Sequence, residues 1–156
     1  MFLYELFPPE LIKIDLESDD KDEVFEEMVD VFCRAKQSNA RKEILEAVHV
    51  RESKMSTGIF KGIAIPHGKT NAVEKIHGVL GISKKGIDYD ALDNQPVYLI
   101  FLLLAPFRES ENHLRILKRM ANLVIHPHFY SELLDQTNPK DVQKTIRKYE
   151  DILISE

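Results

Sequence analysis

The sequence contains one cysteine, no tryptophan and no long apolar run. Because Cys33 is alone, no disulfide can form within the chain, which fits a reducing compartment. The longest apolar run, residues 97–106, is about half of the roughly 18 residues that a membrane-spanning helix needs. The first residues lack the basic region of a secretory signal. These absences predict a cytoplasmic protein that does not insert into a membrane.

Concentrated positive charge is also missing. The formal net charge is −5 at pH 7, and acidic residues cluster between positions 17 and 27. A surface that binds nucleic acid usually needs a basic patch, so nucleic acid is not an expected partner. The 44% hydrophobic and 30% charged content is that of a globular chain. A length of 156 residues suits one domain, so we expect residues 1–156 to form a single domain.

Apolar residues at helical spacing predict helices on either side of a central group of strands. The first helix runs from a cap within residues 18–20 to about residue 35, and Asn39 can cap the second. Ser110 can cap a third helix that ends near residue 125, and a shorter one follows over residues 127–136. Asn138 and Pro139 supply a cap and a first-turn proline for the last helix. The residues expected to face the core are Val24, Met28, Val31, Ala35, Ile44, Leu45, Val48, Leu114, Leu117, Ala121, Val124, Val142 and Ile146.

Three segments have the composition of strands. Residues 63–65 predict a brief strand ended by Pro66, and residues 76–82 predict a second. Residues 97–104 are all apolar except for Tyr98, as in a central strand covered on both faces. Helices before, between and after the strands indicate an α/β layered domain, whose strand order these patterns leave open.

The sharpest chemical feature is Gly62-Ile63-Ala64-Ile65-Pro66-His67-Gly68. Proline fixes the backbone before the histidine, and the following glycine removes a side chain where another molecule could approach. The pattern suits a histidine presented in a surface concavity at the end of a strand. On this pattern alone, His67 could equally be a polar loop residue. The succeeding Gly68-Lys69-Thr70 imitates the end of a P-loop, but Ile63 stands where that motif needs a glycine, so nucleotide binding is rejected.

The sequence resembles the IIA components of the bacterial phosphoenolpyruvate-dependent sugar phosphotransferase system, of the fructose–mannitol type. Arg51-Glu52, Ser56-Thr57-Gly58 and residues 62–68 match the phosphorylation-site signature of that family. Residues 87–97 are similar to a stretch of its nitrogen-related regulatory subgroup, and His113-Leu114 also matches. The resemblance implies an α/β fold in which a mixed β-sheet is flanked by helices on both faces.

The resemblance also implies that His67 accepts a phosphoryl group from the phosphocarrier HPr or a paralogue of HPr. In sugar-transporting members the group then passes to a cysteine of a IIB component. The chemistry agrees, because a neutral imidazole is a competent nucleophile near pH 7 and forms a labile phosphoramidate. In-line phosphoryl transfer depends on positioning and on stabilising charge, so hydrogen-bond donors should surround the equatorial oxygens. No cofactor or metal is expected.

Three further residues are candidates for that site. His113 would lie at the third position of a helix capped by Ser110, where the helix dipole favours an anion; otherwise it is a polar residue at a helix start. The resemblance places it beside His67, as a stabiliser of the phosphoryl group. Arg51 is a possible phosphate contact through its forked guanidinium, or a surface arginine at a helix end. Thr57 is a possible hydroxyl donor, or it shapes the glycine loop.

The other four histidines are given structural roles. His126-Pro127-His128 looks like a metal pair, but the intervening proline and the lack of nearby ligands argue against one. His49 and His77 are isolated in the sequence.

Three functions are consistent with these residues. The first is a phosphohistidine carrier whose phosphorylation state regulates other proteins, favoured by residues 93–96 and by the lack of an attached IIB or IIC domain. The second is the IIA step of a fructose- or mannitol-type permease with its partners on separate chains. The third is a binding module without phosphotransfer, which the intact signature around His67 disfavours.

Overall fold

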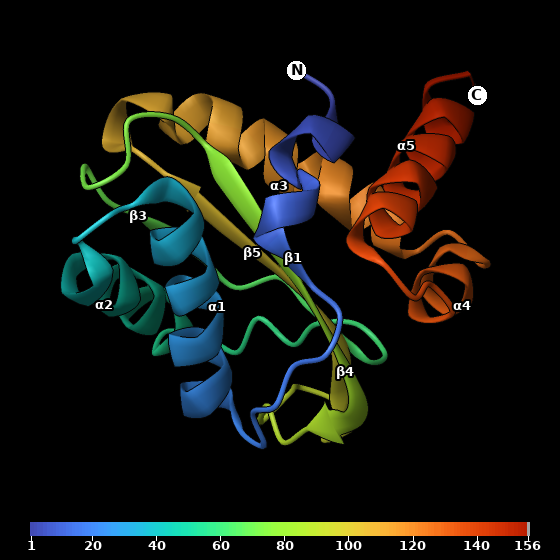
Figure 1. The fold of residues 1–156 in the computed structure, drawn as a ribbon, viewed down its shortest axis with the longest axis horizontal. Helices are drawn as coiled ribbons and strands as arrows, with labels where there is room; N and C mark the ends of the chain where they lie inside the picture. Colours follow the sequence, from blue (N-terminus) through green and yellow to red (C-terminus); the bar gives the residue numbers. More distant parts are fainter. Residues whose placement is uncertain (156) are drawn as a thin grey trace.

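The computed structural model describes residues 1–155 and is built around a five-stranded mixed β-sheet (Figure 1). The strands are β1 (Ile12–Lys13), β2 (Ile63–Ala64), β3 (His67–Lys69), β4 (His77–Ile87) and β5 (Val97–Ala105). The long β4 and β5 pair antiparallel, whereas β1 pairs parallel with β4, and both β2 and β3 pair parallel with β5. The order β1-β4-β5-β2, with β3 also on β5, is information that the sequence patterns did not contain. The expected mixed α/β sheet is confirmed.

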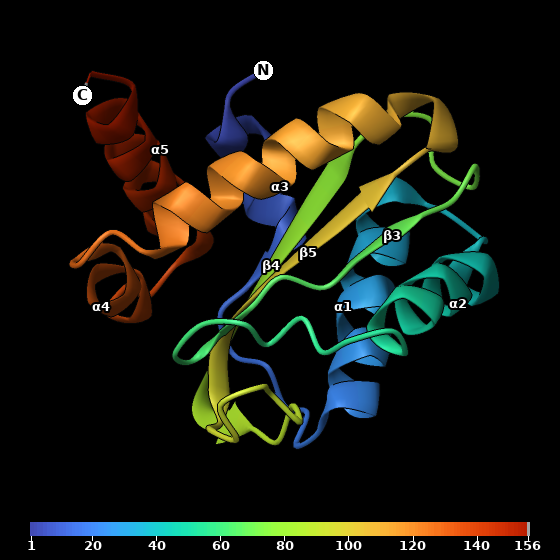
Figure 2. The ribbon, with the colours of Figure 1, turned by 180° about the vertical axis from the view of Figure 1, so that it is seen from behind.

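Helices cover both faces of this sheet, as expected. On one face lie α1 (Lys21–Lys36) and α2 (Arg41–Glu52). On the other face α3 (Ser110–Val124) crosses β4 and β5, with α4 (Phe129–Leu134) and α5 (Pro139–Ser155) beside it (Figure 2). The part of the chain that the structure describes also contains the short 3-10 helices η1 (Leu3–Leu6), η2 (Pro9–Leu11) and η3 (Phe107–Glu109). Within residues 1–155 no helix is long and apolar enough to cross a membrane.

The position of β5 between two layers of helices explains why this strand is almost entirely apolar. Leu99, Phe101 and Leu103 contribute to the core beneath α3, α4 and α5. Ile100, Leu102 and Leu104 alternate with them and contribute to the core beneath α1 and α2. Because successive side chains of a strand point to opposite faces, a strand covered on both sides must be apolar at every position. The prediction of a central strand at residues 97–104 is confirmed.

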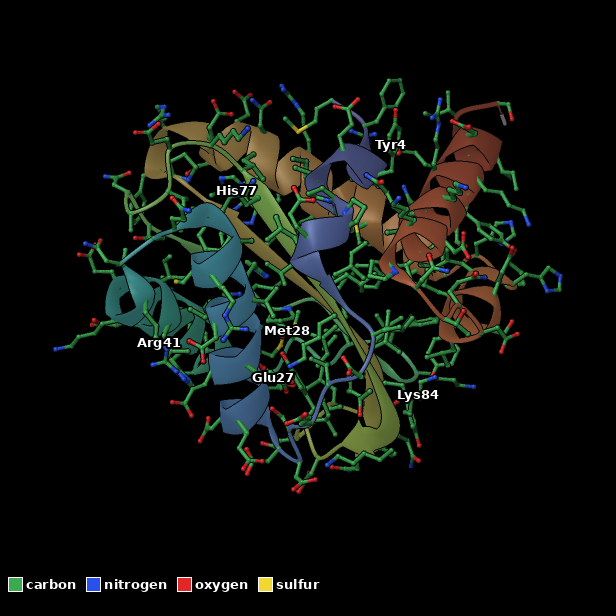
Figure 3. All side chains as sticks on the ribbon, viewed as in Figure 1. Tyr4, Glu27, Met28, Arg41, His77 and Lys84 are labelled. Carbon is green, nitrogen blue, oxygen red and sulfur yellow. The ribbon has the colours of Figure 1, made fainter. Side chains whose placement is uncertain are left out.

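The first helix begins as predicted and departs from the prediction at its end. The Asp20 carboxylate accepts a hydrogen bond from the Glu23 N–H at 2.9 Å, which caps α1. Val24 and Met28 are buried as expected, and Met28 is labelled on α1 in Figure 3. Val31 is only half-buried and Ala35 is exposed. The buried face ends instead at Phe32, because positions 24, 25, 28, 29 and 32 form the stripe that meets the sheet.

The prediction that Asn39 caps the second helix is wrong. Asn39 is exposed, and α2 follows Ala40, which makes no side-chain cap. The Ala40 N–H instead donates to the Ser38 hydroxyl at 3.1 Å, so the connection from α1 is a tight polar turn. Ile44 and Val48 face the core as expected, whereas Leu45 is half-buried.

The third helix is rotated relative to the prediction. Ser110 is its first residue rather than its cap, because the 3-10 helix η3 leads directly into α3 and the Ser110 hydroxyl donates to the Phe107 carbonyl at 2.7 Å. The buried face therefore contains His113 and four apolar residues, Ile116, Met120, Leu123 and Val124. Leu114, expected inside, is 54% exposed, and Leu117 and Ala121 are half-buried. The shift turns an expected core residue, Leu114, toward the molecular surface.

The C-terminal helix agrees with its prediction. The Asn138 side chain accepts a hydrogen bond from the Asp141 N–H at 3.0 Å, and Pro139 is the first residue of α5. Val142 and Ile146 are fully buried. Before it, α4 is shorter than the expected segment 127–136.

Candidate active site

A cavity of about 940 Å³ opens between α2, β3 and the first half of α3. Figure 2 shows these three elements from the side on which α3 crosses the sheet. Arg51 reaches the cavity from α2, His67 from β3 and His113 from α3. Three candidate residues that are far apart in the sequence therefore share one cavity.

His67 is the first residue of β3 and is half-buried. The strand exists because its backbone pairs with β5, where His67 lies opposite Leu103 and the Leu103 N–H donates to the Pro66 carbonyl at 3.0 Å. The histidine thus begins a strand of its own, whereas the sequence pattern predicted that the strand ends at Pro66. Pairing with β5 holds the backbone of His67 in place.

Two hydrogen bonds define the tautomer of the His67 ring. Its Nδ1 lies 3.0 Å from the carbonyl oxygen of Ile65, and a carbonyl can only accept, so Nδ1 carries the proton. On the other side of the ring, Nε2 accepts a hydrogen bond from the Arg51 Nε–H at 3.2 Å. Both contacts assign the lone pair to Nε2, which is therefore the nucleophilic atom of the ring.

The surroundings keep the His67 ring neutral at pH 7. Burial lowers the pKa of His67 below its usual 6.5, and the positive charges of Arg51 and Lys69 act in the same direction. The hydrogen bond to Ile65 and the charge of Glu52 oppose this shift without reversing it. A neutral imidazole at pH 7 is the form that can attack phosphorus.

Positive charge lies where a phosphoryl group would need it. Arg51, Lys54 and Lys69 all line the cavity. Arg51 also donates from Nη1 to the Met55 carbonyl at 2.9 Å, so its guanidinium is held on two sides. Three acidic residues, Glu43 and Glu46 of α2 and Glu111 of α3, also line the cavity.

His113 lies against His67. The two ring centroids are 5.4 Å apart and the rings meet edge to face, at 79°. Glu109 occupies the position before α3, so His113 is the fourth helical residue, one later than predicted. Its side chain is almost fully buried, and its Nε2 has no hydrogen-bond partner within residues 1–155. Burial lowers the pKa of His113 to about 4, with the charges of His67 and Lys69 adding to the effect, so the ring is neutral and has an unused polar atom.

Thr57 lies outside the cavity lining and is 2% exposed. Its hydroxyl donates to the Glu52 carboxylate at 2.5 Å and also contacts the Tyr89 hydroxyl at 2.7 Å. With its proton already donated to Glu52, this hydroxyl is not available to a phosphoryl group. Its contacts place Thr57 in the loop that follows α2, in agreement with the alternative that it shapes the glycine loop.

The space beside Gly68 is filled by α2, whereas the sequence pattern suggested that another molecule could approach there. A Cβ placed on Gly68 would lie 3.0 Å from backbone atoms of Ala47 and Val48 in α2. The molecule that approaches this glycine is therefore a helix of the same chain. The missing side chain allows α2 to pack closely on β3, which brings Arg51 to His67.

Sequence reasoning missed the role of Glu52. It is a buried carboxylate on the inner face of α2, one residue after Arg51. A signal was present, because Glu52 continues the four-residue spacing of the buried Ile44 and Val48. A charged residue on such a stripe indicates a buried partner.

The remaining histidines pack against aromatic rings outside the cavity. His49 contacts Phe25, His77 contacts Phe32, and His126 contacts both Tyr149 and His128. Within residues 1–155 no three His, Cys, Asp or Glu side chains are grouped so that they could hold a metal ion.

The fold and the paired histidines define an α/β protein with a charged, histidine-centred surface cavity. The family model of the phosphoenolpyruvate-dependent sugar phosphotransferase system, EIIA 2, matches residues 5–149. The chain therefore belongs to the EIIA 2 family and is a phosphoryl-transfer component of that system.

Some relatives in this family are named as fructose-specific components, and others as nitrogen regulatory proteins. The chain is 37% identical over 150 residues to the fructose-specific EIIABC component of Bacillus subtilis, covering 96% of this chain and 24% of that protein. It is 36% identical over 124 residues to a nitrogen regulatory protein of Bradyrhizobium diazoefficiens, covering 80% of each. The crystal structure of the nitrogen regulatory protein IIA-Ntr from Neisseria meningitidis superposes with a TM-score of 0.85 at 29% identity, covering 92% of this chain and 98% of that one.

Proposed function

We propose that His67 accepts a phosphoryl group on Nε2 from phosphorylated HPr or a paralogue of HPr, and passes it to a second protein. The observation that carries this proposal is the pair of hydrogen bonds on the His67 ring. Nδ1 donates to the Ile65 carbonyl, which leaves the lone pair on Nε2, beside Arg51. Membership of the EIIA 2 family supports the identity of the donor.

In this proposal the Nε2 lone pair forms a bond to phosphorus as the bond between phosphorus and the donor breaks. Arg51 releases Nε2 and moves its N–H groups to the phosphoryl oxygens, where charge develops in the transition state. Nδ1 keeps its proton, which it still donates to the Ile65 carbonyl, so the imidazole ring of the product has a formal positive charge beside the negatively charged phosphoryl oxygens. When the group leaves, neutral imidazole is recovered, which makes the transfer reversible.

The test is phosphate mapping. The protein is incubated with phosphoenolpyruvate, enzyme I and HPr, and acid-labile phosphate is located in the intact chain and in His67→Ala. We expect labelling of the wild-type chain on Nε2 of His67 and none in the variant. Full labelling of His67→Ala would exclude His67 as the acceptor. His128→Ala, which changes an exposed histidine outside the cavity, is the matched control and should label fully.

We propose further that the phosphorylation state regulates other proteins, and that residues 1–156 act as one EIIA domain. The likeness to the IIA-Ntr structure and to the Bradyrhizobium nitrogen regulatory protein supports a regulatory role. The alternative is transfer to the IIB component of a fructose- or mannitol-type permease, which the identity to the Bacillus subtilis protein favours. Mixing the phosphorylated chain with a fructose-type IIB distinguishes the two. Rapid loss of phosphate from His67 to the IIB cysteine supports transport, and retention supports regulation.

A further inference from the structure

A buried polar cluster lies behind the candidate active site, at the C-terminal end of α2. Its centre is the Glu52 carboxylate, which accepts hydrogen bonds from the Thr57 N–H at 2.8 Å and from the Thr57 hydroxyl at 2.5 Å. The Lys21 ammonium lies 3.2 Å from the same carboxylate and 5.0 Å from the centre of the Tyr89 ring. All four side chains are mostly buried, so their mutual contacts replace those with water.

The direction of the hydrogen bonds in this cluster is fixed by its chemistry. A carboxylate can only accept, so the Thr57 hydroxyl must use its single proton on Glu52. The Tyr89 hydroxyl, 2.7 Å from the Thr57 oxygen, then has to donate to it. Burial and the nearby Glu52 charge raise the pKa of Tyr89, which keeps this proton on the phenol. The chain of donors runs from Tyr89 through Thr57 to Glu52.

The cluster is connected to both nitrogens of His67. The Thr57 carbonyl accepts the Ile65 N–H at 3.0 Å, and the Ile65 carbonyl accepts the Nδ1 proton of His67 at 3.0 Å. In the other direction, Glu52 is the residue after Arg51, whose guanidinium donates to Nε2 of His67. The same guanidinium donates to the Met55 carbonyl, in the loop that Glu52 and Thr57 close.

We propose that Glu52 and Thr57 are positioning residues that fix the His67 tautomer and the direction of the Arg51 guanidinium. Neither residue lines the cavity, so they act through the backbone of the loop 53–58 and of Ile65. This inference rests on the proposed function of His67 for its kinetic consequence. Its structural consequence, a single Nδ1–H tautomer, is a property of the unphosphorylated protein.

The experiment compares Thr57→Val, which removes only the hydroxyl, with Thr57→Ser, which keeps it. The matched control is Thr145→Val, because Thr145 is also a buried threonine, 5% exposed, and donates to the Asp141 carbonyl at 2.8 Å. The first readout is the pair of ring ¹⁵N shifts of His67 in the unphosphorylated protein. We expect the wild type, Thr57→Ser and Thr145→Val to show the Nδ1–H form alone, and Thr57→Val to show a mixture of tautomers.

The second readout is the rate at which His67 accepts the phosphoryl group from phosphorylated HPr. In Thr57→Val we expect kcat to fall about tenfold or more, since small misplacements of reacting groups reduce rates strongly, with KM for the donor within about twofold. Thr57→Ser should recover the rate. Glu52→Gln should reproduce the loss, and a circular dichroism melt checks that each variant is folded.

The outcomes are decisive in each direction. A wild-type tautomer together with a wild-type kcat in folded Thr57→Val would overturn the inference, as would equal losses in Thr57→Val and Thr145→Val. If Glu52→Gln does not fold, the threonine pair still decides. If the wild type is not phosphorylated on His67, the proposed function fails, while the ¹⁵N measurement still tests the positioning role by itself.

Discussion

The Nε of Arg51, near the end of α2, donates to Nε2 of His67, at the start of β3, across 3.2 Å. The contact joins a helix to a strand, and it places a permanent positive charge next to Nε2, the atom that has the lone pair. In the resting protein the guanidinium is hydrogen-bonded to this lone pair. During transfer it is already adjacent to the oxygens of the arriving phosphoryl group.

Replacing Arg51 by lysine should therefore slow phosphoryl acceptance although the charge is kept. Lysine lacks the planar fork and cannot contact both His67 and the Met55 carbonyl as Arg51 does. Loss of one such donor should reduce kcat by about a hundredfold, as measured by single-turnover labelling. Arg41→Lys is the control, because Arg41 begins α2, at the end away from Arg51, and pairs with Asp30 of α1; Figure 3 labels Arg41. Equal rates for the two variants would contradict the assigned role of Arg51.

The rate of acceptance should depend on pH through His67. Only the neutral ring attacks, and burial lowers the pKa of His67 below its usual 6.5, so kcat/KM should change little between pH 8 and pH 7, where the ring is already mostly neutral. It should then fall about tenfold per pH unit once the pH drops below the lowered pKa. The ring proton shift of His67 in NMR titration gives the pKa independently, and the His77 ring, with a pKa lowered to about 4 by burial, provides a comparison in the same spectrum. A rate that rises on acidification would contradict the neutral nucleophile.

His113 should support the phosphoryl group without carrying it. Its almost fully buried Nε2 lacks a partner within residues 1–155 and lies in a ring 5.4 Å from that of His67. His113→Leu fills the space without a donor, and His113→Gln keeps one. We expect the leucine variant to be labelled on His67 about a hundredfold more slowly, with a smaller loss in the glutamine variant. Identical kinetics in wild type and His113→Leu would leave His113 as a packing residue.

The same histidine should make folding stability depend on pH. Burial lowers the folded-state pKa of His113 from 6.5 to about 4. Between these values the unfolded chain binds a proton there and the folded chain does not, so stability is complete above pH 6.5 and is lost as the pH falls toward 4. The slope from one such group approaches about 1.4 kcal/mol per pH unit. Urea unfolding at pH 7, 6 and 5 measures it, and His113→Leu should show a smaller slope than wild type.

Gly68→Ala should weaken both stability and transfer. The added Cβ would meet the backbone of Ala47 and Val48, which cannot move without shifting α2. We expect a loss of about 1–3 kcal/mol in the free energy of unfolding, together with slower labelling of His67, since α2 carries Arg51. Gly81→Ala is the control for transfer, because its Cβ would meet the Leu16 side chain and not α2, so any loss of stability there should leave the labelling of His67 unchanged. A Gly68→Ala protein with wild-type stability would contradict the close packing of α2 on β3.

Residues close together in the sequence determined much of this protein. The apolar run of β5 predicted a strand buried on both faces, and Asp20 and Asn138 predicted two helix starts. The segment from Gly62 to Gly68 marked His67 as a candidate, and the resemblance to the IIA components then favoured it over a polar loop residue. These features depend on periodicity and backbone chemistry within a few residues, which a sequence contains directly.

Contacts between distant residues were decided only by the tertiary structure. The rotation of α3 puts His113 inside and Leu114 outside, because η3 sets where the helix begins. The backbone of α2 occupies the space above Gly68, which no local pattern reveals. The lone pair of His67 is on Nε2 because Ile65 and Arg51 approach opposite sides of the ring. These three features depend on how the helices pack on the sheet. Local periodicity does not determine the order of the strands in that sheet, so the features are seen only in the folded chain.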